Sequence, residues 1–334
     1  MLGRRMTTKT AFVTGGTGFL GRNLVDVLLA EGWSVTCLHR ASSNVAPLAK
    51  LGVSLVVADM LDAAALAKVI PEGADAVFHV AANTGMWKKK NAEQTRDNVD
   101  ATRAMVDAAL AAKAKRFALT SSIAAFALDD GDLDESTPQR GATSWINYER
   151  TKFLAEKVVR DAGDRGLDAV VLNPGHIVGK YDTHNWCQMI TMVHDGTLPA
   201  VPPGRGPFGS AHEIAKAHVR AIERGGAGER FLLGGVHATF AELVAVIGQV
   251  LGKEVKARAM PPFVLKALGA VKGLVGDLRG KEPDLTPEKA AIICQNLRVV
   301  STKATDRLGF EAVPLKTMIA ECVDWMRAEG KLAD

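Results

Sequence analysis

Tyr148 and Lys152 stand four residues apart in a stretch with helical periodicity, so both side chains lie on one face of the expected helix. A free tyrosine has a pKa near ~10 and is a poor acid–base at neutral pH. A nearby ammonium favours the phenolate, so we expect Lys152 to lower the pKa of Tyr148 into a useful range. The segment Thr120-Ser121-Ser122 closes an apolar strand, and a serine hydroxyl there can hold a substrate oxygen while its charge changes.

A glycine-rich turn follows an apolar strand at 10–14 and precedes a helical pattern. Gly16, Gly18 and Gly21 satisfy the spacing G-x-G-x-x-G, and Gly15 extends it. Glycines here allow positive φ and let a pyrophosphate approach the backbone, while the helix offers free N–H groups to the phosphates. In this context the motif predicts dinucleotide binding rather than a turn that binds nothing.

The end of the second strand indicates which nicotinamide cofactor to expect. NAD sites usually place an acid about 20 residues past the glycines, where it holds the ribose 2′-hydroxyl. Here the strand at 34–39 is followed by Arg40, whose planar fork suits a 2′-phosphate, and Ser42 can add a hydroxyl. We therefore expect NADP in preference to NAD. Asp59 is placed either to meet the adenine edge or to act as an ordinary turn aspartate.

Strands alternate with helices along the first two thirds of the chain, which predicts right-handed βαβ units and a parallel sheet. The expected strands cover 10–14, 34–39, 54–58, 76–81, 116–120, 169–172 and 229–233, and the expected helices cover 63–69, 91–112, 148–162 and 211–224. The strands are almost continuously apolar, as in a sheet covered on both faces. The fold class we expect is α/β, a Rossmann-type doubly wound parallel sheet with a smaller, mostly helical C-terminal substrate lobe.

Two units follow from this pattern. Residues 1–176 with about 211–236 form the expected dinucleotide-binding domain, and about 177–210 with 237–334 form the substrate-binding lobe. Proline and glycine are dense between Pro199 and Gly209, which we interpret as a loop.

Composition excludes several classes of protein. The 334 residues include 47% hydrophobic and 23% charged side chains and carry a net charge of +4, which gives no reason to expect nucleic-acid binding. The basic run at 88–90 is interpreted as a solvated loop. The four cysteines form no C-x-x-C pair, which favours a reducing compartment and no metal site. We see no signal peptide or membrane span, so we expect a cytoplasmic protein.

Five ordered motifs together resemble the extended branch of the short-chain dehydrogenase/reductase superfamily, which includes epimerase/dehydratase-like proteins. They are T-G-G-T-G-F-L-G at 14–21, V-F-H-V-A-A at 77–82, T-S-S at 120–122, Y-E-R-T-K at 148–152 and N-P-G-H-I-V-G at 173–179. The segment at 98–102 is similar to the family's N-V-x-G-T, with Ala101 in place of the glycine. Weaker motifs at 134–138, 233–235 and 325–330 are similar to those of dihydroflavonol reductases, 3β-hydroxysteroid dehydrogenases and hopanoid-associated homologues.

The resemblance implies catalysis by Ser122, Tyr148 and Lys152. Tyr148 would be the general acid–base, and Lys152 would bind the nicotinamide ribose. Ser122 is preferred to Ser121, whose side chain points the other way on an extended segment. The resemblance also implies a homodimer through the helices at 91–112 and 148–162. The candidate cofactor-binding residues are Gly15, Gly18, Phe19, Leu20, Gly21, Arg40, Asp59, Met60, Ala81, Lys152, Asn173 and Pro174.

Net reduction competes with two other functions. Sugar dehydratases of this group carry Thr-Asp-Glu where this chain has T-S-S, and epimerases with tightly bound NAD favour an acid where this chain has Arg40. A cofactor-sensing or scaffold protein would be expected to have lost Tyr148 or Lys152. We therefore expect an enzyme that passes hydride between NADP and a carbonyl or secondary alcohol. Large side chains near the expected cleft favour an apolar small-molecule substrate, and the candidates for contact with it are Met86, Trp87, Trp145 and His176.

The stretch at 261–275 places Val264, Leu268, Val271 and Val275 on one helical stripe. Most such helices pack on their own domain, which is what we expect here. Peripheral contact with a membrane surface is the less favoured alternative.

Overall fold

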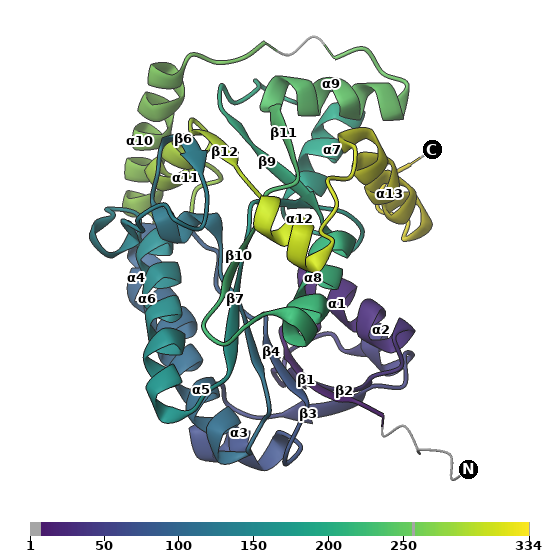
Figure 1. Ribbon diagram of the computed structural model, residues 1–334. Helices are drawn as coiled ribbons and strands as arrows, with labels where there is room; N and C mark the ends of the chain where they lie inside the picture. Colours follow the sequence, from purple (N-terminus) through teal and green to yellow (C-terminus); the bar gives the residue numbers. More distant parts are fainter. Residues whose placement is uncertain (1–7, 256–257, 334) are drawn as a thin grey trace.

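The computed structural model describes residues 8–255 and 258–333. Its main sheet is parallel throughout and has the strand order β3-β2-β1-β4-β5-β7-β10 (Figure 1). These strands are β1 (Thr10–Thr14), β2 (Ser34–His39), β3 (Ser54–Val57), β4 (Ala76–His79), β5 (Phe117–Thr120), β7 (Ala169–Pro174) and β10 (Arg230–Leu233). The crossover between β3 and β4 returns the chain to the middle of the sheet and leaves a switch point at the carboxyl ends of β1 and β4. The predicted Rossmann-type fold class is confirmed.

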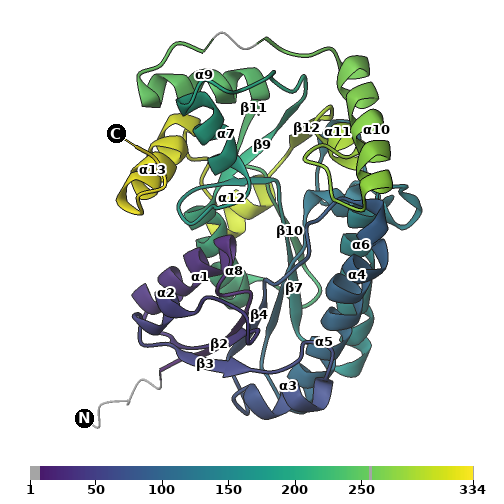
Figure 2. The same cartoon turned by 180° about the vertical axis from the view of Figure 1, so that it is seen from behind.

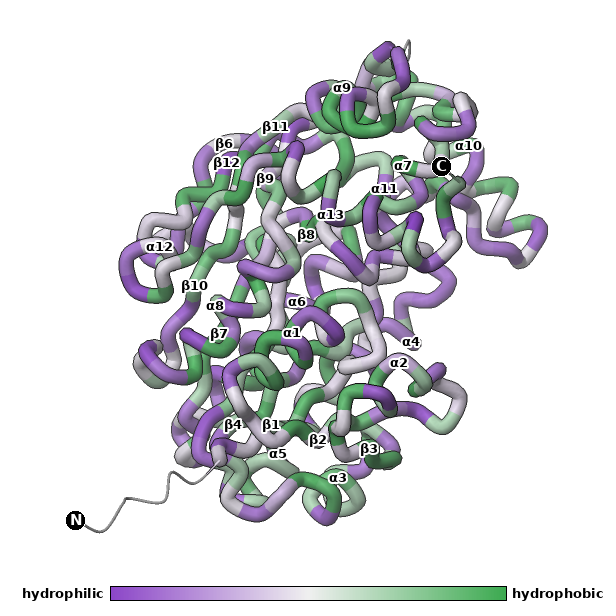
Figure 3. Tube along the Cα trace, turned by 90° about the vertical axis from the view of Figure 1, so that its right-hand side faces the viewer, coloured by the Kyte–Doolittle hydropathy of each residue, from purple (hydrophilic) through white to green (hydrophobic). Residues whose placement is uncertain are grey.

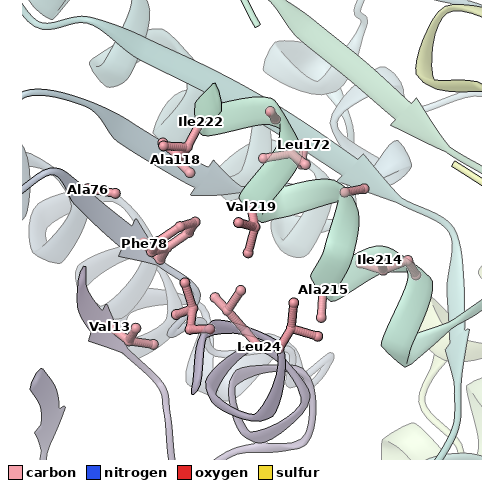
Figure 4. Packing of buried hydrophobic residues seen from close by; sticks show 14 of the residues in the cluster. Val13, Leu24, Ala76, Phe78, Ala118, Leu172, Ile214, Ala215, Val219 and Ile222 are labelled. Atoms are coloured by element: carbon pink, nitrogen blue, oxygen red, sulfur yellow. The ribbon is translucent and has the colours of Figure 1, made fainter. Parts of the chain in front are cut away.

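Helices cover both faces of this sheet. One face packs against α1 (Phe19–Ala30), α2 (Ala46–Ala49), α8 (Ala211–Arg224) and α12 (Thr302–Leu308), and the other against α3 (Ala63–Val69), α5 (Ala101–Ala111) and α6 (Asn147–Asp161). Figure 4 shows Phe78 and Leu24 meeting Val219 in the first of these cores. Because both faces are dry, nearly every side chain of the central strands is buried. Figure 3 shows the same strands as hydrophobic stretches inside more hydrophilic connections.

A second core lies above the carboxyl ends of the strands. Its small sheet has the order β11-β9-β12-β6, with β8 added beside β9. The strands are β6 (Asp130–Leu133), β8 (His176–Val178), β9 (Arg205–Ser210), β11 (Val236–Thr239) and β12 (Asn296–Val299). The helices are α7 (Trp186–His194), α9 (Phe240–Leu251), α10 (Pro262–Arg279), α11 (Pro287–Ile292) and α13 (Leu315–Ala328). Helices α7, α9 and α13 enclose the apolar residues of this lobe.

Two sequence predictions are wrong in detail. The loop expected at 199–209 contains most of β9, because the neighbouring β8 and β11 supply hydrogen-bonding partners to a glycine-rich segment. The single helix expected at 91–112 is divided into α4 (Asn91–Thr95), a π-helical turn (Arg96–Asp100) and α5. The short 3₁₀ helices are Lys88–Lys90, Ile123–Phe126, Gly141–Thr143 and Ala162–Arg165.

The division into two domains stays a prediction. Helix α12 lies in the range assigned to the lobe, yet Ala304 and Leu308 join the core beneath α1 and α8. None of the described helices is long and apolar enough to cross a membrane.

Candidate active site

The glycine turn after β1 is built from positions that tolerate no side chain. Gly15 has φ +72°, and a Cβ there would lie 2.7 Å from the backbone nitrogen of Ala81. A Cβ on Gly21 would lie 2.0 Å from the Gly15 carbonyl oxygen, so α1 can approach the turn only because Gly21 is glycine. Gly18 caps α1 without a side-chain hydrogen bond. The first-turn N–H groups of α1 therefore have no side-chain acceptor and point toward the turn.

This cradle fits the pyrophosphate of a dinucleotide. An absent Cβ at the turn leaves room for phosphate oxygens, and the uncapped helix N-terminus, which begins at Phe19 and Leu20, offers donors and a positive dipole end. These are the positions that the sequence predicted for the phosphates.

Strand register brings the other predicted cofactor residues to the same edge. Thr14 pairs with Leu38 on one side and with His79 on the other, so Arg40 and Ala81 both follow at the level of the glycine turn. Arg40 is exposed. Asp59 precedes Met60 at the end of β3 and accepts a hydrogen bond from the Leu61 amide at 3.0 Å, as an ordinary turn aspartate does.

Ser122, Tyr148 and Lys152 meet at the carboxyl end of β5. Ser122 caps the 3₁₀ turn after β5 and accepts a hydrogen bond from the Ala124 amide. Its hydroxyl also hydrogen-bonds the phenol of Tyr148, which lies in the first turn of α6. The buried Lys152 is one turn further on, with Nζ 5.9 Å from the centre of the Tyr148 ring and 3.0 Å from the Thr120 carbonyl, to which it donates. Ser121 points away and donates to Glu156 at 2.6 Å.

The pKa of Tyr148 differs from what the sequence predicted. Burial raises the pKa of the phenol above its usual value of 10, although the hydrogen bond from Ser122 works in the opposite direction. Burial also lowers the pKa of Lys152 to about 8, and the nearby carboxylate of Glu156 only partly offsets this. The expected lowering of the Tyr148 pKa by Lys152 is therefore wrong, because the same burial that brings the two groups together disfavours both charges. At neutral pH the phenol keeps its proton.

Two buried histidines hold the strand ends around the site, and the sequence analysis missed both roles. The two ring nitrogens of His79 hydrogen-bond the hydroxyls of Thr14, at 2.9 Å, and Thr102, at 3.1 Å. These bonds connect β4 to β1 and α5. The Thr120 hydroxyl donates a hydrogen bond to Nε2 of His218 at 2.8 Å. The other ring nitrogen, Nδ1, donates to the Ile214 carbonyl at 2.7 Å. Burial lowers the pKa of His79 to about 3 and that of His218 to about 4, so both rings are neutral.

A buried carboxylate, Glu156, was also missed. It lies one turn beyond Lys152 and accepts hydrogen bonds from Ser121 and from Asn173 Nδ2, both at 2.6 Å. Its second oxygen accepts from Arg230 at 2.7 Å and from Gln139 at 2.7 Å. The four-residue spacing from Tyr148 through Lys152 to Glu156 is the signal that could have identified it.

Replacing Arg230 with methionine should lower the free energy of unfolding by about 2 kcal/mol, because the Glu156 carboxylate has no exposed surface and would lose the nearer of its two arginine partners, with Arg160 remaining at 3.5 Å. The matched control is Arg298→Met, which breaks an ion pair with Asp132 whose side chains are 62% and 59% exposed and should cost less than about 1 kcal/mol. Urea unfolding of both variants measures the difference. Equal losses would show that Arg230 does not stabilise this buried charge.

The segment at 98–102 begins inside the π-helical turn, where Asn98 holds the chain that follows β4. The side-chain oxygen of Asn98 accepts a hydrogen bond from the Asn83 backbone amide at 2.7 Å, and its Nδ2 donates to the Asn83 carbonyl at 2.9 Å. It also donates to Thr151 of α6 at 3.0 Å. The turn therefore fixes the chain after β4 against the helix that carries Tyr148 and Lys152.

The remaining predicted residues do not all gather at the triad. Asn173 is fully buried, and its amide donates to the Ser122 carbonyl at 2.8 Å as well as to Glu156, while Pro174 ends β7. Trp87 is buried, and its indole donates to Asp277 of α10 at 2.9 Å. The half-buried Met86 precedes it. Trp145 is 61% exposed, three residues before Tyr148.

His176 lies in the lobe within an aromatic cluster. Its ring centre is 5.3 Å from that of Trp186, 5.1 Å from that of Phe208 and 5.7 Å from that of Phe240. Burial lowers the pKa of His176 to about 4, so it packs as a neutral ring. No group of histidine, cysteine and acidic side chains in the described residues could hold a metal ion.

Comparison with known proteins decides the family. The model of the NAD-dependent epimerase/dehydratase family matches residues 11–234, which include the glycine turn and the triad. The chain belongs to this family. It is thus an extended short-chain dehydrogenase/reductase, an enzyme of the NAD(P)-dependent oxidoreductase type, and the family binds a nicotinamide cofactor.

Relatives within the family differ in their named activities. The chain is 28% identical over 330 residues to sterol demethylase protein B of Methylococcus capsulatus, covering 97% of this chain and 100% of that protein. It is 27% identical over 359 residues to 3β-hydroxysteroid-dehydrogenase/decarboxylase isoform 1 of Arabidopsis thaliana, covering 95% and 80%. The crystal structure of a nucleoside-diphosphate-sugar epimerase from Pseudomonas aeruginosa superimposes with a TM-score of 0.79, at 25% identity and 98% and 100% coverage.

Proposed function

We propose that this family member is an NADP-dependent oxidoreductase that passes hydride between the nicotinamide and a carbonyl or secondary alcohol of an apolar small molecule. The observation that carries the proposal is the meeting of Ser122, Tyr148 and Lys152 at the carboxyl end of β5, near the glycine turn. The named activities of the two sterol-related relatives support an apolar substrate.

The chain's own residues suit the reduction direction. The Ser122 hydroxyl holds the carbonyl oxygen, and the protonated phenol of Tyr148 donates a proton to that oxygen as negative charge develops there. The ammonium of Lys152 would hold the nicotinamide ribose, and the Ser122 hydroxyl donates to the phenolate that remains. A bound nicotinamide supplies or accepts the hydride. The protein's part is to orient the oxygen and to supply the proton.

Arg40 carries the proposal for NADP. Arg40 is exposed and directly follows β2, and no carboxylate stands there to hold a 2′-hydroxyl. Arg40→Ala should weaken NADPH binding about tenfold to a hundredfold, because it removes charge-assisted hydrogen bonds to the 2′-phosphate, and should leave NADH binding within about twofold. Fluorescence titration with both dinucleotides measures this. Lys68→Ala, at an exposed cation on α3, is the control, and equal losses of both dinucleotides with Arg40→Ala would refute the assignment.

A nucleotide-sugar epimerase with tightly bound NAD is the second candidate, favoured by the structural likeness to the Pseudomonas epimerase. A screen of NADPH consumption over aldehydes, flavonoid-like ketones, steroid ketones and nucleotide sugars separates the two. We expect NADPH loss with an apolar ketone or aldehyde. Conversion of a nucleotide sugar without net NADPH loss would assign the protein to the epimerases.

A further inference from the structure

Helix α10 packs on the protein with Leu265 and three glycines. Gly269, Gly273 and Gly276 are buried on one side of the helix. A Cβ on Gly269 would lie 2.8 Å from Ala290, and one on Gly273 would lie 2.9 Å from the ring of Pro287, so these glycines allow α10 to approach α11 closely. Figures 1 and 2 show α10 at the outer edge of the lobe, with α11 on its inner side.

Apart from Leu265, the large apolar residues of α10 face the other way. At about 100° per residue they occupy one arc opposite the three glycines. Of the twelve exposed large hydrophobic side chains among the residues that the structure describes, seven belong to this helix. They are Phe263 (75% exposed), Val264 (38%), Leu268 (36%), Val271 (60%), Leu274 (62%), Val275 (39%) and Leu278 (79%).

The expectation that this helix packs its apolar stripe on its own domain is therefore wrong. A contiguous apolar surface of this kind marks an interaction site.

Positive charge borders the apolar arc on both sides. Lys266 lies at one edge, and Arg279 and Lys272 lie at the other. The acidic residue of α10, Asp277, lies on the same edge as Lys266, where it pairs with Lys88 at 2.7 Å and accepts the Trp87 indole. On the other edge, Lys272 pairs with Asp284 at 2.9 Å. An apolar face between cationic edges is the arrangement of a helix that lies in the interface of an anionic membrane.

We propose that α10 docks the protein onto an anionic phospholipid surface, with its outward face inserted among the acyl chains and its cations among the headgroups. An 18-residue helix presents a stripe about 27 Å long and about 10 Å wide. The seven exposed side chains present on the order of several hundred Å² of accessible apolar surface, so the cationic border of the helix, rather than the area, selects the occupant. Pairing two copies through α10 would also bring their cationic edges together.

Co-sedimentation with phospholipid vesicles tests this surface without any assay of activity, so it is independent of the proposed reaction. Wild-type protein should sediment with vesicles of phosphatidylcholine and phosphatidylglycerol in a three-to-one ratio. The double variant Phe263→Ser/Leu278→Ser should partition at least about tenfold more weakly, because it removes the two most exposed apolar side chains. The control Leu51→Ser/Leu61→Ser changes two exposed leucines elsewhere and should bind as wild type does.

A second variant tests the contribution of charge. Lys266→Gln/Arg279→Gln should weaken binding to the anionic vesicles about tenfold, and vesicles of phosphatidylcholine alone should bind less wild-type protein. Wild-type protein that stays in the supernatant, or an apolar variant that binds as tightly as wild type, would overturn the proposal. Sedimentation equilibrium tests whether a second copy of the chain covers this face. If wild-type protein is a dimer and Phe263→Ser/Leu278→Ser converts it to a monomer, the face binds a second copy and the membrane proposal is overturned.

Discussion

Replacing Tyr148 with phenylalanine should lower turnover by about 10³-fold while leaving NADPH affinity within about twofold, because the variant keeps the ring and loses the proton donor. The phenol is held by Ser122 and keeps its proton at neutral pH, since burial raises its pKa. Steady-state rates with a reducible ketone, together with a fluorescence titration of NADPH, measure the two quantities separately.

The other tyrosine in the chain is the matched control. The Tyr181 hydroxyl donates to Asp26 of α1 at 2.8 Å, away from the triad. Tyr181→Phe removes the same atom from the same residue type, so turnover should stay within about threefold of wild type, as expected for one partly buried hydrogen bond outside the triad. Wild-type turnover in Tyr148→Phe would remove Tyr148 from the mechanism.

The free energy of unfolding should fall steeply as the pH drops from about 6.5 to about 5. Burial lowers the pKa of His79 to about 3 and the pKa values of His176 and His218 to about 4, from 6.5, so all three rings bind protons in the unfolded chain first. Stability is therefore present above the unfolded pKa and is lost as the pH falls toward the folded pKa. Three protons correspond to a slope approaching about 4 kcal/mol per pH unit. Urea unfolding at several pH values measures it.

His218→Gln isolates one of these protons, since glutamine can still exchange hydrogen bonds with Thr120. The slope in this variant should be about two thirds as steep over the same range. His184→Gln, at an exposed histidine, should leave the slope unchanged. A wild-type stability that is flat between pH 6.5 and 5 would contradict the neutral state of the three buried rings.

The first half of the fold follows from the sequence because local and global signals agree there. Strands β1 and β4 are apolar on both faces and are joined by glycine turns and amphipathic helices, so their neighbours in the sheet follow from the right-handed crossover rule. The glycine motif and the Tyr148–Lys152 spacing are local patterns too. Their meeting at one edge of the sheet could therefore be predicted.

The small sheet of the lobe could not be predicted in this way. Strand β6 has a single apolar residue, Leu133, and pairs with β12, which lies far away in the sequence. Strand β9 contains Gly206, where a Cβ would lie 2.6 Å from the ring of His176. Glycine is needed there because of a tertiary contact, whereas the same residue in the sequence alone indicates a loop.

Parts of the candidate site also depend on contacts between residues that lie far apart in the sequence. Trp87 was expected to meet substrate, but its indole binds Asp277 on a helix nearly two hundred residues later. The direction of the Tyr148 pKa shift depended on burial, which spacing does not reveal. The homodimer through the helices at 91–112 and 148–162 stays a prediction.

The most direct test of the proposed reaction follows the hydride itself. NADPH deuterated at the transferable position of the nicotinamide is mixed with excess enzyme and a ketone from the screen, and the products are analysed by mass spectrometry after a single turnover. We predict deuterium on the new carbinol carbon and one oxidised cofactor for each alcohol formed. An alcohol formed without deuterium on its carbinol carbon, with the label still on the cofactor, would contradict the account.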